Sequence, residues 1–322
     1  SVKMWYPADE NSLSERAPYV DQYELIAKAL STSLGVPEAL MSRAGAVKCN
    51  SWLNTDISIG NFPIVIYSHG HQSLKIANTF QAEEIASNGY IVIAPDHTYD
   101  AALTIINEDK IIYTRSKLPN SDEEAEDSEM IKRVKEQLNI RVEDISFVID
   151  KMIEKFSKDK QFNQSADFEN IGIFGHSFGG CTAIMAANND NRIDAILGLD
   201  AYFLPIPNYI IDKDINKPFV HLGQTSWGDS NNYELMKIWG SNNSQNSFHF
   251  SVEGSKHNDF TDFSQFTKLT RKFGSGKVPR KIMRNIMNDV MLQFFNYHLK
   301  SIDNFDVNQF ENKYKRVETY VH

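Results

Sequence analysis

The pentapeptide Gly175-His-Ser-Phe-Gly179 can present a nucleophile. Apolar residues at 171 and 173–174 come before it, and small or apolar residues at 180–187 follow it. In a G-x-S-x-G pattern between a strand and a helix, the glycines keep side chains away from a strained turn that exposes the serine hydroxyl. The pattern therefore predicts that Ser177 is a catalytic nucleophile. The alternative is a glycine-rich turn whose serine only caps the helix.

A serine hydroxyl is a weak nucleophile, so a base must take its proton and a third group must orient that base. In a sheet of this kind the acid and then the histidine follow the serine, each at the C-terminal end of a later strand. Asp200 directly follows the apolar run 193–199, whereas Asp194 begins the same run at the wrong end of the sheet. His257 follows the last predicted strand, in a glycine-bearing loop. We therefore predict Asp200 as the orienting carboxylate and His257 as the base.

The other eight histidines fit the role of the base less well. They lie within predicted strands, near the C-terminus, inside the pentapeptide or before the serine in the chain. The three that precede the serine are expected to shape loops: His69, His71 and His97.

Acyl transfer also needs an oxyanion hole, which is formed by two backbone N–H groups aimed at the developing negative charge. One should belong to Phe178, the residue after the nucleophile. The other should come from the loop 68–71 after the first central strand, where Gly70 lets the backbone approach closely. We predict the amide of His71 for this role, and its imidazole could also contact the substrate.

An apolar loop, 201–211, begins directly after Asp200. Its first large residues, Tyr202, Phe203 and Leu204, are predicted to wall an acyl pocket or to meet a lipid surface. Packing of this loop against the segment 19–43 is an equal alternative.

Strands that alternate with helices must position these residues. Short apolar runs predict strands at 1–7, 62–67, 90–94, 171–174, 193–199, 218–222 and 248–252, and helical spacing predicts helices at 77–88, 140–156 and 280–299. This alternation predicts an α/β fold with a mostly parallel central sheet and helices on both faces. We expect one domain over 1–322, with a helical insertion at about 19–43 and an acidic insertion at about 115–139, whose charged part, 120–129, resembles a solvated surface segment.

The composition narrows the classes of partner. The 322 residues are 41% hydrophobic, which is ample for a core, and the net charge of −9 argues against nucleic acid. No apolar run is long enough to cross a membrane, and the chain shows no signal-peptide pattern after Ser1, although a leader could have been removed. The two cysteines lack metal-ligand spacing, so no metal or cofactor is expected.

The sequence resembles the platelet-activating factor acetylhydrolase family of the secreted, lipoprotein-associated type, within the α/β-hydrolase fold. The segments that carry the resemblance are 6–8, 62–70, 85–92, 141–148, 175–180, 199–201, 257–263 and 294–299. The resemblance implies the same triad, Ser177, Asp200 and His257, and the same oxyanion amides. It also implies a calcium-independent esterase acting on sn-2 acetyl or oxidised phospholipids, and it favours a secreted or cell-envelope location. The chain departs from the family pattern at His71, where a smaller apolar residue is common.

These observations together predict a serine carboxylic-ester hydrolase that works through an acyl-enzyme on short-chain acyl esters. Its partner is then a small ester or a phospholipid, with peripheral contact to a lipid surface as an option. Two alternatives stand beside this prediction. One is a broader esterase of the cutinase or dienelactone-hydrolase kind, and the other is a non-catalytic binding protein with the α/β-hydrolase fold.

Overall fold

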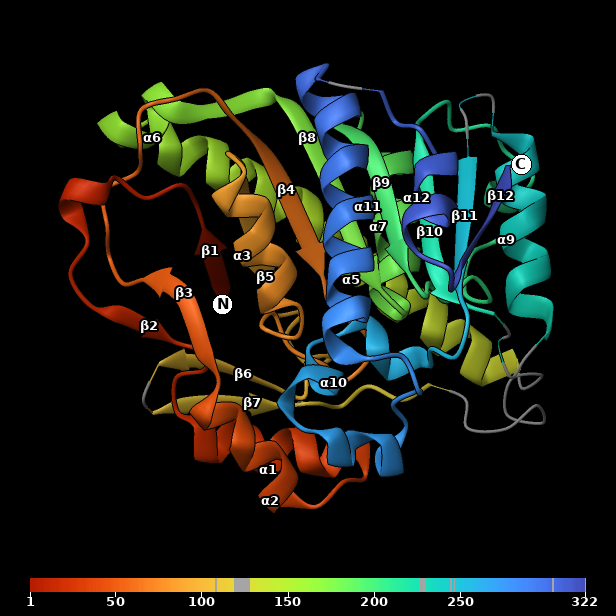
Figure 1. The fold of residues 1–322 in the computed structure, drawn as a ribbon, viewed down its shortest axis with the longest axis horizontal. Coiled ribbons are helices and arrows are strands. Elements are labelled where there is room, and N and C mark those ends of the chain that lie inside the picture. The colour runs from red at the N-terminus through yellow and green to blue at the C-terminus, as the bar shows by residue number, and fades with distance from the viewer. Residues whose placement is uncertain are drawn as a thin grey trace.

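A computed structural model describes residues 1–107, 109–118, 128–225, 227, 230–243, 245, 247–302 and 304–321. This part of the chain forms an eight-stranded sheet in the order β1-β5-β4-β8-β9-β10-β11-β12 (Figure 1). The strands are β1 (Val2–Trp5), β4 (Phe62–Ser68), β5 (Ile91–Pro95), β8 (Ala166–His176), β9 (Ile193–Leu199), β10 (Phe219–Gln224), β11 (Ser247–Val252) and β12 (Val317–Val321). The central strands are parallel, and the edge strands β1 and β12 run antiparallel to their neighbours.

The side chains of β4 show why its sequence is apolar without interruption. Ile64 and Ile66 belong to one buried cluster, whereas Val65 and Tyr67 belong to another. Successive strand residues point to opposite faces, so a strand covered on both faces needs apolar residues at every position. The first cluster includes α5 (Ser128–Phe156) and α7 (Phe178–Asn189), and the second includes α3 (Thr79–Ser87), α11 (Arg280–Lys300) and α12 (Asn308–Lys313). The prediction of a mostly parallel sheet with helices on both faces is therefore confirmed.

One predicted helix differs in extent from the structure. The helix predicted at 140–156 is the C-terminal part of α5, which begins at Ser128. Its first turns bury only single residues such as Val134 and Leu138, so they lack the dense apolar stripe that marked the later turns. Most of the acidic segment 120–129 lies outside the described residues; only its last two positions belong to α5.

The segment 19–43, which we interpret as an insertion, contains α1 (Tyr23–Leu34) and α2 (Glu38–Met41). Gly35 ends α1 with a positive φ of 62°, a conformation that glycine adopts at little cost. Figure 1 shows both helices beyond the C-terminal ends of the central strands, beside α10 (Phe263–Phe266). The insertion therefore lies over the edge of the sheet where the candidate residues gather.

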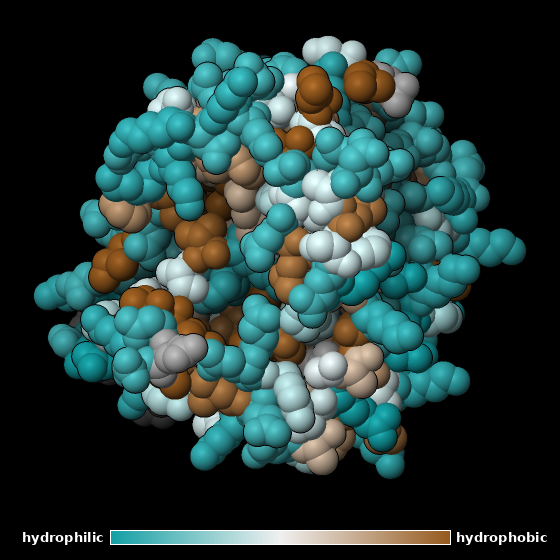
Figure 2. Space-filling model, turned by 90° about the vertical axis from the view of Figure 1, so that its left-hand side faces the viewer, coloured by the Kyte–Doolittle hydropathy of each residue, from teal (hydrophilic) through white to brown (hydrophobic). Residues whose placement is uncertain are grey.

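The remaining elements surround this frame. Two small antiparallel pairs are β2 (Arg16–Pro18) with β3 (Lys48–Trp52), and β6 (Leu103–Asn107) with β7 (Lys110–Tyr113). The other helices are α6 (Lys160–Ser165), α8 (Asn208–Ile211) and α9 (Ser230–Asn242), and short 3-10 turns are η1 (Glu10–Ser12), η2 (Ser42–Ala46), η3 (His257–Phe260) and η4 (Lys268–Phe273). The face at the left of Figure 1 is mostly hydrophilic, with hydrophobic residues in separate groups (Figure 2). Within the described ranges, no helix has both the length and the apolar character needed to span a bilayer.

Candidate active site

The turn that carries Ser177 joins β8 to α7, as the sequence predicts. Ser177 has φ 56° and ψ −120°, an unfavourable backbone conformation for a residue with a side chain. A Cβ atom on Gly175 would lie 2.0 Å from the carbonyl oxygen of Gly179, and one on Gly179 would lie 1.9 Å from that of Ser68. Only glycine fits at either position, so this backbone packing holds Ser177 on a tight turn at the end of β8.

The sheet register brings Asp200 beside this turn. His176 pairs with Leu199 in the neighbouring strand, so Ser177 and Asp200 both come directly after the ends of adjacent parallel strands. The amide of Ser177 donates to the carbonyl of Leu199 at 3.0 Å, and the amide of Asp200 donates to that of Leu222 at 2.8 Å. The two residues are therefore held at the same edge of the sheet by main-chain hydrogen bonds.

Asp200 is fully buried and holds His257 by a hydrogen bond of 2.7 Å from Nδ1 to Oδ2. The Tyr233 hydroxyl donates to Oδ1 at 2.7 Å, and Gln224 donates through its amide nitrogen at 3.1 Å and through Nε2 at 2.9 Å. Burial by itself raises the pKa of Asp200, but the hydrogen bonds from His257, Tyr233 and Gln224 outweigh it and lower the pKa below its ordinary value. Asp200 is therefore an ionised carboxylate that fixes the His257 ring, leaving Nε2 for proton transfer.

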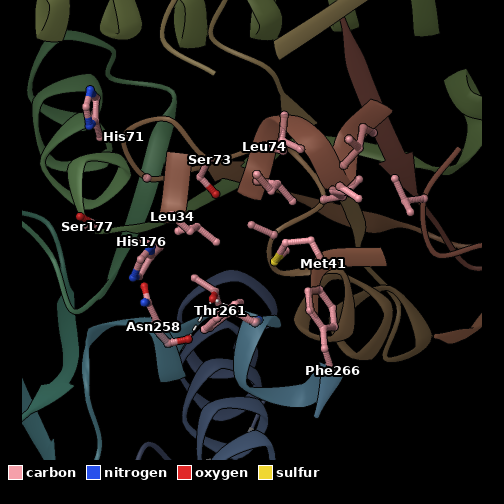
Figure 3. Close-up of a pocket in the computed structure, with 18 of the residues that line it drawn as sticks. Leu34, Met41, His71, Ser73, Leu74, His176, Ser177, Asn258, Thr261 and Phe266 are labelled. Atoms are coloured by element: carbon pink, nitrogen blue, oxygen red, sulfur yellow. Dashed lines mark hydrogen bonds between the residues drawn. The ribbon is translucent and has the colours of Figure 1, made fainter. Parts of the chain in front are cut away.

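Ser177 and His257 line the same pocket, which has a volume of about 260 Å³ and is also bordered by Gly70 and His71 (Figure 3). Among the described residues, no hydrogen bond to the Ser177 hydroxyl is formed. Contacts of this kind are often loose without substrate and tighten in the complex. The pocket therefore brings together the predicted nucleophile, the predicted base and the loop predicted to supply an oxyanion amide.

One face of α1 forms much of the pocket wall. The contributing residues follow the i, i+3, i+4, i+7, i+11 pattern of one helix face: Tyr23, Ile26, Ala27, Leu30 and Leu34. Met41 and Phe266 lie at the end of the pocket far from Ser177 (Figure 3). The helix α1 thus supplies an apolar wall that the sequence pattern does not predict.

The predicted pocket residues Tyr202, Phe203 and Leu204 are not among the described residues that line this pocket. Phe203 is fully buried, and its ring packs against those of Phe219 and Trp239 in the core, not against the segment 19–43. An apolar residue next to Asp200 can fill the core beneath α9 as readily as it can face the substrate. Tyr202 lies nearer to the site, because its ring stacks on Trp227, whose ring centroid is 4.8 Å from that of His257.

The two predicted oxyanion amides belong to segments that touch. Phe178 is the first residue of α7, so its amide has no acceptor within the helix. The loop with His71 lies close to the turn, because a Cβ on Gly70 would be 3.0 Å from Nδ1 of His176 and 3.4 Å from Cβ of Ser177. The His71 ring is 6.5 Å from the Phe178 ring, and Figure 3 shows it pointing away from the apolar end of the pocket.

A second Ser-His-Asp arrangement lies behind this loop. The Ser68 hydroxyl is 3.0 Å from Nε2 of His97, and Nδ1 of His97 is 2.9 Å from Oδ2 of Asp144. Ser68 and His97 are fully or almost fully buried and do not line the pocket, and burial lowers the pKa of His97 well below its ordinary value. The sequence analysis does not predict this buried Ser68–His97–Asp144 group. The sequence feature that could have indicated a buried polar group here is Arg141, a charged residue within the apolar stripe of the helix predicted at 140–156.

His176 packs against the candidate base, and its burial has a measurable effect on the pH dependence of stability. Its Nε2 donates to the carbonyl of His257 at 3.1 Å, and the two rings are 4.5 Å apart. Burial, and then the nearby charge of His257, lower the pKa of His176 to about 3. Since the unfolded chain binds this proton near pH 6.5, the stability contributed by neutral His176 is present above that pH and is lost as pH falls towards 3.

We therefore expect the unfolding free energy of the wild type to fall, relative to that of His176→Gln, by about 1.4 kcal/mol per pH unit between pH 6 and 4. Urea unfolding of both proteins at pH 7.5, 5.5 and 4.5 measures this difference. Gln keeps an N–H donor for the carbonyl of His257 but cannot titrate. Parallel pH dependence in the two proteins would contradict the expectation.

Comparisons with known proteins are consistent in family and fold. The family model described as "Platelet-activating factor acetylhydrolase, isoform II" matches residues 1–320. The chain is 25% identical to the platelet-activating factor acetylhydrolase of Canis lupus familiaris, over 95% of this chain and 73% of the relative, and 24% identical to that of Gallus gallus, over 95% and 79%. A ferulic acid esterase from Streptomyces cinnamoneus has a similar structure, with a TM-score of 0.76 at 23% identity over 99% of this chain and 88% of the other. The structural likeness supports an α/β-hydrolase-like fold.

Proposed function

The chain belongs to the platelet-activating factor acetylhydrolase, isoform II, family, and from this premise we propose that it is a serine carboxylic-ester hydrolase with Ser177, Asp200 and His257 as its triad. The observation that carries the proposal is the shared pocket. Ser177 lies on a strained turn there, and the same pocket is lined by His257, whose Nδ1 is hydrogen-bonded to a buried, ionised carboxylate. That arrangement can activate the serine hydroxyl as a nucleophile at neutral pH by general-base catalysis.

In the proposed reaction, Nε2 of His257 takes the proton from Ser177 as Oγ bonds to the ester carbonyl carbon. The electron pair of the carbonyl moves to its oxygen, which accepts hydrogen bonds from the amides of His71 and Phe178. Collapse of this intermediate breaks the ester bond, and His257 gives its proton to the departing alcohol. Water, deprotonated by His257, then attacks the acyl-enzyme, and His257 returns the proton to Oγ of Ser177 as the acid is released. No metal takes part in the proposed steps.

The pocket supports an apolar acyl group. A cavity of 150 Å³ lined by apolar residues binds benzene, so a volume of about 260 Å³ has room for roughly ten carbon atoms. We include sn-2 acetyl and oxidised phospholipids in the proposal because of the family. One relative, 23% identical over 62% of this chain and 49% of its own length, is described as a probable 1-alkyl-2-acetylglycerophosphocholine esterase of Arthroderma benhamiae.

A broader esterase is the second candidate, and one feature of the pocket favours it. The described lining residues include no Lys, Arg, Asp or Glu. A phosphate headgroup held in this pocket would therefore find no cationic side chain to pair with. Such a pocket suits uncharged esters as well as phospholipids.

Hydrolysis of a series of esters separates these candidates. The wild type would be assayed with p-nitrophenyl acetate, butyrate, octanoate and hexadecanoate, and with an sn-2 acetyl phosphatidylcholine, with and without a calcium chelator. Turnover of the phospholipid at a rate similar to that of the acetate ester, unaffected by the chelator, supports the family substrate. Ester turnover without phospholipid turnover supports the broader esterase. No turnover of any substrate, together with no labelling of Ser177 by a fluorophosphonate, would leave only the non-catalytic alternative.

The wall formed by α1 makes a further prediction about chain length. Ala27 is 2% exposed and lies midway along the lining face of α1. Ala27→Phe should fill the pocket and lower kcat/KM for the octanoate at least about tenfold relative to the acetate. Lys28→Phe is the matched control, because it adds the same ring on the exposed side of the helix. An unchanged ratio of octanoate to acetate activity in Ala27→Phe would show that acyl chains bind elsewhere.

A further inference from the structure

Arg141 is a charged side chain buried inside the protein. It begins the segment 141–148 on α5, in a stripe with Leu138, Val142 and Ile145, and is 1% exposed. Its Nη1 pairs with Oδ2 of Asp100 at 2.9 Å, and the Asp100 side chain is only 5% exposed. Buried ion pairs cost desolvation energy and often stabilise a fold no better than apolar residues do. The contacts of Arg141 therefore need an explanation beyond core packing.

Arg141 contacts both segments that carry the proposed oxyanion amides. Its Nη2 donates to the carbonyl oxygen of His69 and, at 3.2 Å, to the hydroxyl of Ser68. The guanidinium also lies 4.8 Å from the centroid of the Phe178 ring, within range of a cation–π contact. One buried cation thus joins the loop 68–71 to the first residue of α7.

The His69 ring fixes the orientation of the peptide that carries the amide of His71. Its Nε2 accepts a hydrogen bond from the amide of His97 at 3.1 Å, so Nδ1 carries the proton and donates to the carbonyl of Gly70 at 2.7 Å. Burial, and then the charge of Arg141, lower the pKa of His69 to about 3, which keeps this ring neutral. In a planar trans peptide the Gly70 carbonyl and the His71 N–H point in opposite directions, so a bond to the carbonyl also orients the N–H.

Ser68 and His97 complete the support. The Ser68 hydroxyl accepts from Arg141 and donates to Nε2 of His97, and His97 then donates from Nδ1 to Asp144. Each of these groups has a hydrogen-bonding role inside the protein. Their arrangement is that of a scaffold behind the loop 68–71.

We propose that Arg141 is a positioning residue, which holds the loop 68–71 and the start of α7 so that the amides of His71 and Phe178 point at one oxygen. The inference rests on the proposed serine-esterase reaction. Without the guanidinium fork, Ser177, Asp200 and His257 stay in place, but the two amides lose their shared support. Removal of the Arg141 side chain should therefore weaken the stabilisation of the transition state more than it weakens substrate binding.

Arg141→Met is the variant that tests this inference. We expect kcat for p-nitrophenyl butyrate to fall about 100- to 1,000-fold with KM changed less than about threefold. The affinity for a butyl boronic acid, which forms a tetrahedral adduct on Ser177, should weaken by a similar factor. Arg141→Lys keeps the charge but not the fork, so it should recover only part of the loss.

Ile145→Ala is the matched control for general loss of stability, because Ile145 lies one turn further along the same buried stripe and its apolar side chain forms no hydrogen bond to the loop 68–71. It should lower the unfolding midpoint while kcat and boronate affinity stay within about threefold of wild type. Phe178→Leu provides a second variant if Arg141→Met does not fold. It removes the ring beneath Arg141 but keeps the amide, and should lower kcat about tenfold at constant KM.

The inference is overturned if Arg141→Met or Phe178→Leu raises KM at unchanged kcat, or if their kcat and boronate affinity match those of Ile145→Ala. Either result, with the wild type active and Ser177→Ala inactive, leaves the proposed function standing. A wild type that hydrolyses none of the esters overturns both.

Discussion

Replacing Ser177 by alanine is expected to lower kcat/KM for p-nitrophenyl acetate by about 10⁴- to 10⁶-fold. The variant keeps the pocket, Asp200 and His257, but no oxygen remains that can form the acyl-enzyme. Spectrophotometric assays of p-nitrophenol release, at the same concentration of wild type and variant, measure the loss of activity. Labelling by a fluorophosphonate should also disappear. Since alanine is smaller than serine, the turn at the end of β8 should fold normally.

Ser68→Ala is the control for this experiment, because the Ser68 hydroxyl is hydrogen-bonded to a histidine, His97, outside the proposed triad. Ser68 is fully buried and supports the loop 68–71, so its loss should cost at most about tenfold in kcat and should leave fluorophosphonate labelling intact. The opposite pattern, with Ser68→Ala unlabelled and Ser177→Ala active, would transfer the nucleophile to Ser68.

Asp200→Asn is expected to lower kcat about 10⁴-fold at neutral pH. The carboxylate now accepts the Nδ1–H of His257, which leaves Nε2 free to act as the base. Asparagine can instead present its N–H₂ group to Nδ1, which places the ring proton on Nε2 and blocks proton transfer from Ser177. Kinetics between pH 6 and 10 measure this loss, which should shrink at high pH, where hydroxide can assist.

Asp194→Asn is the matched control at the opposite end of β9. Its carboxylate accepts from the amide of Ile171 at 3.0 Å, far along the strand from the Ser177 turn. We expect activity within about twofold of wild type. If the two Asn variants lose activity equally, Asp200 has no special part in the reaction, and the proposed triad is wrong.

Much of the sheet follows from local properties of the chain. Continuous apolar runs such as 62–67 can be satisfied only when both faces of a strand are covered, so they identify the central strands without tertiary information. Prediction from local sequence fails where an element is defined by its tertiary contacts and not by its own residue pattern. The first turns of α5 are too polar to predict, and β12 reaches the sheet only after a long separation in the chain.

The candidate site divides in the same way. The turn around Ser177 depends on Gly175 and Gly179, whose steric need is written in the pentapeptide itself. The positions of Asp200 and His257 follow from a general rule, since carboxyl ends of parallel strands meet at one edge of the sheet. These residues could therefore be named before any coordinates were known, and their catalytic roles are the subject of the tests above.

By itself, the sequence determined the mostly parallel sheet, the strained turn and the family to which the chain belongs. Only the tertiary structure decided which apolar residues face the pocket and what supports the loop 68–71. An apolar side chain is buried equally well against the core or against a cavity, so Phe203 and the lining face of α1 could not be told apart from sequence alone. Arg141 reaches its hydrogen-bond partners across gaps of 41 to 73 residues, and only folding brings such distant groups together.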